Sequence, residues 1–291
     1  MGWIKMKQKI YNYVNVLIIS IATGYYIWSN QEILTLFKDY GVGSILILMS
    51  EIIFVHLLKM IRLYFTLYDS KIEFHEYFRI YCKVTPVSVI LPFKLGEFFR
   101  MYCYGYKINN FLKGMIIIIL DRFMDTIALV TVILLSLGVT GGHLTRFIYF
   151  LFIFLLLLIP IYAAFPGIYQ FWRKWLLKSN ASTKKLCVLK MLDTLKKVYL
   201  EVENVIKGRG MILYFLSLIA WGIEIGCLIL LNEYTQSDGL TQSISTYLTT
   251  AMNGGQSAGL RRFSFASIIM MIIWYLGMKM YDVLKRKRKC K

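Results

Sequence analysis

Long runs of apolar residues dominate this sequence and restrict the folds that it can adopt. Several runs reach about 20 residues, which lets a helix cross a hydrocarbon layer about 30 Å thick. The chain of 291 residues is 58% hydrophobic. Its runs lack the alternation of apolar and polar residues that is typical of strands. We therefore predict an all-α fold, a polytopic integral membrane helix bundle that forms one transmembrane domain over residues 1–291.

The apolar runs predict about six full spans and two interrupted segments. The full spans are expected at about residues 10–28, 42–65, 114–139, 146–165, 211–232 and 263–282. The interrupted segments lie at about 80–105 and 243–260, and their pieces are too short to cross alone. Pro86 and Pro92 are expected to break the first, since proline lacks an N–H and clashes with the preceding turn. We interpret both segments as re-entrant or broken helices.

The basic residues predict how the chain is oriented. The net charge is +18, and most Lys and Arg residues lie in the stretch 59–113, in a segment at 167–210 and in the C-terminal tail. Basic residues concentrate in cytoplasmic loops and near anionic lipid head groups. We therefore expect a multi-pass protein of the plasma membrane with both termini in the cytoplasm. Its expected partners are membrane lipids, mainly anionic ones, and not nucleic acid.

The segment 167–210 is predicted to be a cytoplasmic basic loop. Pro160 and Pro166 are expected to end the span before it. The later half of the segment has apolar residues at helical spacing, which indicates a helix lying on the membrane surface.

Several ionisable residues lie within the apolar segments. Each costs about 2.5–3.5 kcal/mol at the bilayer centre, so each is expected to face the protein interior and to have a partner there. Three of them are candidates for a proton or polar relay, the alternative being ordinary polar contacts within the bundle: Glu51, His56 and Glu224.

Six further charged residues form two groups on consecutive elements. The first group has a spacing of three residues, and the second shares one face of a helix. We interpret them as a substrate-binding cluster in which the bases hold a phosphate and the acids hold the bases. The alternative is a salt-bridge network that only fastens the two elements together. The six are Lys94, Glu97, Arg100, Asp121, Arg122 and Asp125. We expect a contact between the groups and a polar cavity beside them.

The same residues carry a resemblance to a known family. A Pro-x-x-x-Gly-Glu-x-x-Arg motif occupies residues 92–100, and an acidic-Arg-x-x-Asp motif occupies residues 121–125. Together they resemble the transmembrane, flippase-like domain of lysylphosphatidylglycerol synthases, which also exists as stand-alone membrane proteins without the synthase domain. The resemblance covers about residues 10–285. It implies binding and translocation of an anionic phospholipid or a lipid-linked sugar phosphate in bacterial envelope biogenesis.

The chain also departs from that family's pattern. The family's second half usually carries a Pro-Gly-Gly-x-Gly-x-x-Glu stretch, whereas this chain reads "AMNGGQSAGLRR" there, without the Pro and the Glu. The synthase domain is absent as well, so aminoacyl transfer from tRNA is not expected of this chain.

Two other functions stay open. One is a membrane glycosyl- or phosphotransferase acting on a lipid carrier, and the other is a non-transporting accessory subunit that would partner an envelope-assembly enzyme. No Asp-x-Asp pair, P-loop or nucleophile elbow supports the enzyme. The carboxylates of Asp121 and Asp125 could hold Mg²⁺, but Arg122 between them favours ion pairing. The three His and five Cys lack metal-ligand spacing. We therefore predict no catalytic residue, no metal and no cofactor.

Overall fold

The computed structural model describes residues 2–29, 41–91, 95–140, 146–178, 183–230 and 258–289. Regular structure in these residues is entirely helical, which confirms the predicted all-α class. The elements are α1 (Gly2–Ser29), α2 (Val42–Leu67), the short 3₁₀ helix η2 (Tyr68–Ser70), α3 (Phe74–Ile90), α4 (Leu95–Ile108), α5 (Phe111–Thr140), α6 (Arg146–Lys178), α7 (Thr183–Leu230) and α9 (Ala258–Lys289).

Four stretches of helix are long and apolar enough to cross a membrane. By length and composition these are Val42–Ser70, Phe152–Lys178, Thr183–Cys227 and Arg261–Tyr281. Each overlaps one of the spans expected from the sequence. A shorter apolar stretch, Tyr13–Tyr26, lies in α1. The chain is therefore a membrane protein, while the count of six spans and the side on which the termini lie stay predictions.

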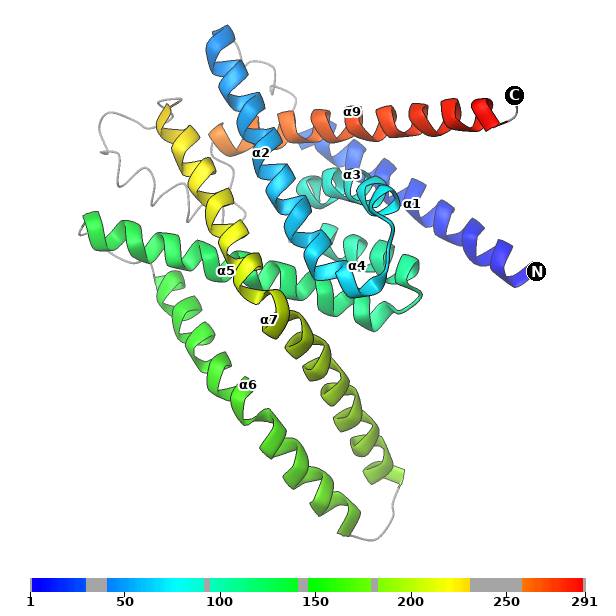
Figure 1. Ribbon diagram of the computed structural model, residues 1–291, viewed down its shortest axis with the longest axis vertical. Helices are drawn as coiled ribbons and strands as arrows, with labels where there is room; N and C mark the ends of the chain where they lie inside the picture. Colours follow the sequence, from blue (N-terminus) through cyan, green and yellow to red (C-terminus); the bar gives the residue numbers. More distant parts are fainter. Residues whose placement is uncertain are drawn as a thin grey trace.

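The helices are arranged around the α2–α7 pair. Figure 1 shows α5 running across this pair, with the short helices α3 and α4 beside it and α9 packed against α3. The core between α2, α3 and α4 contains Tyr77 and Tyr104, both with no exposed surface. The Tyr77 hydroxyl donates a hydrogen bond to the Met60 carbonyl at 2.6 Å, because a buried phenol needs a polar partner.

The interrupted segment at 80–105 consists of α3 and α4. The two helices pack so closely that a Cβ atom on Gly96 would lie 2.1 Å from the Ser88 Cα atom. Only glycine fits at such an approach of two backbones. Gly96 therefore allows α4 to lie directly against α3.

Pro86 does not break this segment, contrary to the sequence-based expectation. It lies inside α3 and is buried. A proline removes one backbone hydrogen bond, and membrane helices tolerate this where neighbouring groups satisfy the freed polar atoms.

The prediction that Pro160 and Pro166 end a span is also wrong. Helix α6 continues through both prolines to Lys178. Residues 179–182 lie outside the described residues, and α7 then runs for 48 residues. Residues 167–178 and 183–210 are therefore helix, which confirms the helix predicted for the later half and not the loop predicted before it. The position of this segment at the membrane surface stays a prediction.

Side-chain contacts explain why α6 and α7 stay helical so far. The Tyr199 ring packs on the rings of Tyr162 and Phe165, with centroids 4.9 and 5.0 Å apart. The Tyr169 hydroxyl donates to the Asp193 carboxylate at 3.0 Å. A helix of 48 residues is about 72 Å long, more than twice the thickness of a hydrocarbon core. In Figure 1 the lower parts of α6 and α7 form a hairpin that extends away from the other helices.

The second interrupted segment, at about 243–260, lies almost wholly outside the described residues. Only its last three positions, 258–260, are described, and these begin α9.

Candidate functional site

A buried ionic cluster joins four helices near the middle of the molecule. Helix α5 supplies three of its charges because Asp121, Arg122 and Asp125 occupy neighbouring positions on one side of that helix. The Asp121 side chain has no exposed surface, and that of Asp125 is 14% exposed. Charges so well shielded from water need close partners of opposite sign.

The main partner of both carboxylates is Arg62 of α2. The Arg62 Nε atom donates to Asp121 Oδ1 at 2.8 Å, and Nη2 donates to Asp121 Oδ2 at 3.2 Å. The Nη1 group donates to the Asp125 carboxylate and, at 2.7 Å, to the Ser217 hydroxyl of α7. The Arg62 side chain is 1% exposed. One guanidinium group thus links α2, α5 and α7, using the two-pronged geometry that arginine offers to a carboxylate.

Arg62 was not among the residues predicted for the site. Its sequence neighbourhood reads as the basic end of a span, where arginine commonly faces water or lipid head groups. A usable signal was the spacing of polar residues on α2. Glu51, Lys59, Arg62 and Thr66 recur at intervals compatible with one broad helix face.

Helix α4 adds the remaining pair, Glu97 and Arg100. An Arg100 Nη1 group donates to the two oxygens of Glu97 at 3.1 and 3.3 Å. The Arg122 Nε atom of α5 lies 3.9 Å from Glu97 Oε1. The sequence-based prediction of a contact between these two groups of residues is therefore confirmed by Glu97 and Arg122. Lys94, the sixth predicted residue, lies outside the described residues.

The cluster is balanced in charge. Arg62, Arg100 and Arg122 face Glu97, Asp121 and Asp125, so the six formal charges sum to zero. Arg122 is the most accessible of the three arginines: its side chain is 35% exposed, against 6% for Arg100 and 1% for Arg62. It also holds Asp121 at 2.8 Å. The carboxylate of Glu97 lies between the two guanidinium groups that α4 and α5 provide.

The three relay candidates lie outside the cluster, nearer to the N-terminus of α2 and to the C-terminus of α7. Glu51, His56 and Glu224 are 4–5% exposed. The Glu224 carboxylate accepts a hydrogen bond from the Lys59 ammonium group at 2.7 Å. His56 Nδ1 lies 3.4 Å from the Tyr81 hydroxyl. These contacts place Glu224 in an ion pair, and a relay role for the three residues stays a prediction.

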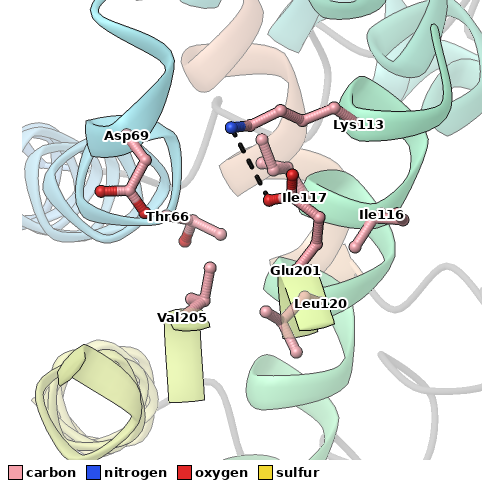
Figure 2. Close-up of a pocket in the computed structure, with 8 residues that line it drawn as sticks. All are labelled: Thr66, Asp69, Lys113, Ile116, Ile117, Leu120, Glu201 and Val205. Atoms are coloured by element: carbon pink, nitrogen blue, oxygen red, sulfur yellow. Dashed lines mark ion pairs between the residues drawn. The ribbon is translucent and has the colours of Figure 1, made fainter. Parts of the chain in front are cut away.

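A pocket lies one helical turn from the ionic cluster, between α2, α5 and α7. Figure 2 shows its charged rim, where Lys113 of α5 reaches Glu201 of α7 at 3.6 Å and the Asp69 carboxylate lies on the opposite side. Asp69 is paired with Arg209. The other lining residues are mostly apolar and comprise Thr66, Ile116, Ile117, Leu120 and Val205. None of the three arginines and three carboxylates of the ionic cluster lines this pocket. The pocket is therefore not the polar cavity expected beside them.

Metal binding finds no support in the described part of the chain. No group of three or more His, Cys, Asp and Glu side chains there could hold an ion. Asp121 and Asp125, the carboxylates considered for Mg²⁺, share Arg62 as their partner. Arginine cannot give up its charge to make room for a cation, so these carboxylates serve ion pairs.

Comparison with known proteins gives one match. A family model described as "Lysylphosphatidylglycerol synthase TM region" matches residues 14–260. No curated protein matches the chain significantly. No solved structure does so either.

Proposed function

The chain belongs to the lysylphosphatidylglycerol synthase transmembrane family, and on that premise we propose that it binds and translocates an anionic phospholipid or a lipid-linked sugar phosphate. The proposed setting is envelope biogenesis in a bacterial plasma membrane, with both termini in the cytoplasm. The family match supports a membrane protein of lipid and envelope biology. The ligand class is inferred from the chemistry of the ionic cluster.

The observation that carries the proposal is the position of Glu97. Its carboxylate lies 3.1 Å from Arg100 and 3.9 Å from Arg122. Two guanidinium groups around one small anion make the arrangement that proteins use for phosphate. The anion present here is a side chain that is 15% exposed and belongs to the short helix α4. Glu97 therefore occupies the place in which a phosphate oxygen would bind.

The charge balance suggests how a lipid would bind. An anion added to a neutral buried cluster would be poorly compensated, whereas an anion that replaces Glu97 leaves the balance unchanged. In the proposed cycle the phosphate takes Arg100 and Arg122 while Glu97 turns away with α4. Arg62 keeps Asp121 and Asp125 in place, and these carboxylates hold Arg122 in position for the exchange.

Glu97→Gln tests this exchange directly. The amide cannot compete as an anion, so the affinity for an anionic phospholipid should rise. Loss of one charge-assisted hydrogen bond of about 1.5–3 kcal/mol corresponds to a gain of about ten- to a hundredfold. Binding would be measured by titrating dioleoyl phosphatidylglycerol into the purified chain in detergent. Glu201→Gln is the matched control, because Glu201 also pairs with a base, Lys113, but lies in the neighbouring pocket.

Two results would contradict the proposal. In the first, Glu97→Gln leaves lipid affinity unchanged while it lowers stability, as expected if the cluster only fastens α4 to α5. In the second, Arg100→Lys binds the lipid as well as the parent chain does. An ammonium group cannot reproduce the two-pronged contact, so that variant should bind at least tenfold more weakly.

The hairpin of α6 and α7 favours a second candidate, an accessory subunit that partners an envelope-assembly enzyme. Its far end carries exposed basic side chains, including Arg173, Lys174, Lys178, Lys184 and Lys190. Because α7 is much longer than a membrane is thick, this end can reach a partner in the cytoplasm. Co-purification of an enzyme with the parent chain, but not with a chain lacking these five charges, would support the subunit.

A further inference from the structure

A second buried polar cluster lies on α2, one turn before Arg62, where α7 and α9 pack against it. The Lys59 ammonium group is 2.7 Å from Glu224 Oε1. It also lies 5.7 Å from the centroid of the Trp221 ring and 5.9 Å from that of Phe263. The His56 ring stacks on Phe263, with centroids 6.0 Å apart and planes at 13°. Lys59 and His56 thus both lie against the Phe263 ring, and Lys59 also lies near the Trp221 ring.

This second cluster holds buried polar atoms that no hydrogen bond satisfies in the described part of the chain. The indole N–H of Trp221 and the Nε2 atom of His56 are buried and have no hydrogen-bond partner among the described residues. The two residues are 7% and 4% exposed. Lys59 has three N–H bonds, of which Glu224 takes one. Buried polar groups almost always have a partner, so the cluster is incomplete without an acceptor.

The polar groups without a partner indicate the chemistry of the acceptor. The indole can only donate, and so can the lysine. Glu224 neutralises Lys59, so an anion is compensated here only where it takes the place of Glu224 at the ammonium group, as in the exchange proposed for Glu97. The rings of Trp221 and Phe263 cover part of the Lys59 ammonium group, whose side chain is 21% exposed, and partial shielding from water strengthens a contact between charges. Free donors around a shielded cation favour an anion with several oxygens, such as a phosphate.

We propose that His56, Lys59 and Trp221 form a second phosphate subsite for the lipid head group. The proposal rests on the proposed function and names the next position of the same ligand. Lys59 and Arg62 are three residues apart on α2, which corresponds to a rise of about 4.5 Å along the helix. On α7, Ser217 of the first cluster and Glu224 of the second are seven residues apart and share a face. The two clusters are therefore neighbours along the α2–α7 interface.

Lipid-binding stoichiometry tests the second subsite. The probe is dioleoyl phosphatidylglycerol, added to the purified full-length chain in detergent and counted by native mass spectrometry. The parent chain should retain two lipids. Trp221→Phe removes the N–H and keeps a ring, so binding of the second lipid should weaken at least fivefold while the first is retained. Trp172→Phe on α6 is the matched control, since the Trp172 side chain is exposed.

A second variant addresses the charge. Lys59→Met alone would leave Glu224 buried without its partner, so the test uses Lys59→Met with Glu224→Gln, which removes the pair as a neutral unit. This double variant should retain one lipid. Two lipids of unchanged affinity in both variants would overturn the inference. So would a second lipid that diacylglycerol of the same chains replaces equally well, because the site would then not require a phosphate group.

The outcomes separate this inference from the proposed function. A parent chain that binds one lipid, lost in Arg100→Lys and unaffected in Trp221→Phe, would overturn the second subsite and keep the function. A parent chain that binds no anionic lipid would overturn both. Competition with inorganic phosphate identifies the source of the ligand. Displacement of the second lipid by phosphate supports a subsite for the phosphate group itself, and saturation by phosphate without any second lipid would overturn its assignment to a lipid head group.

Discussion

Removing Arg62 should destabilise this protein more than removing any exposed arginine. Arg62→Met keeps an unbranched chain of similar length but deletes the contacts to Asp121, Asp125 and Ser217. Two carboxylates would then be left in an interior from which water is excluded. Arg173→Met on α6 is the control, because that side chain is exposed.

The size of the effect can be worked from the contacts. Breaking a buried ion pair by removing one partner costs about 3–5 kcal/mol. Asp121 has no exposed surface but keeps Arg122 at 2.8 Å, so part of its charge stays compensated. We therefore expect a loss near the lower limit, about 3 kcal/mol. Adding Asp121→Asn removes one stranded charge, so the double variant should be more stable than Arg62→Met alone by at least about 1 kcal/mol.

The free energy of unfolding would be measured by denaturant titration in detergent micelles, followed by circular dichroism. The variants are Arg62→Met, Asp121→Asn and the double variant that combines them. The reasoning would be refuted by a loss below about 1 kcal/mol in Arg62→Met. It would equally be refuted if the effects of the single variants simply added in the double variant, because groups in direct contact should show coupling.

Two further predictions concern packing and topology. Gly96→Ala should lower the free energy of unfolding by about 1–3 kcal/mol, because the new Cβ atom would meet the Ser88 backbone at 2.1 Å. Gly222→Ala, where nothing lies within 4 Å, should cause no loss of stability. Equal stability of the two variants in the same denaturant titration would disprove the close contact. Single cysteines at positions 184 and 287, in a chain lacking its native cysteines, should resist an impermeant thiol reagent in intact cells. Both positions are basic and are assigned to the cytoplasm. Labelling of position 287 from outside would rule out six spans.

Local sequence carried much of the candidate site. The spacing of Asp121, Arg122 and Asp125 places their side chains together on any helix, and Glu97 and Arg100 follow the same rule on theirs. Both groups lie inside apolar segments, so mutual contact is the cheapest way to bury them. The pair of Glu97 and Arg122 shows this contact. The roles of these residues in binding stay predictions.

The prolines show where local rules mislead. Pro86, Pro160 and Pro166 lie within helices, although each removes one backbone hydrogen bond. The cost of that loss is local, whereas α3 packs against α4 and α9, and α6 contacts α7 through side chains such as Tyr162 and Tyr199. The balance between them depends on which helices become neighbours, and a single sequence does not contain that information.

By itself, the sequence determined that this chain is a set of membrane helices with buried charges. A backbone in lipid must satisfy its own hydrogen bonds, and long apolar runs without strand alternation do so as helices. Only the tertiary structure decided which charge neutralises which. Arg62 meets Asp121 across 59 residues of chain, and Lys59 meets Glu224 across 165. Ion pairs form between groups that packing brings within a few ångströms, and the packing of α2 against α5 and α7 places these two bases beside their carboxylates.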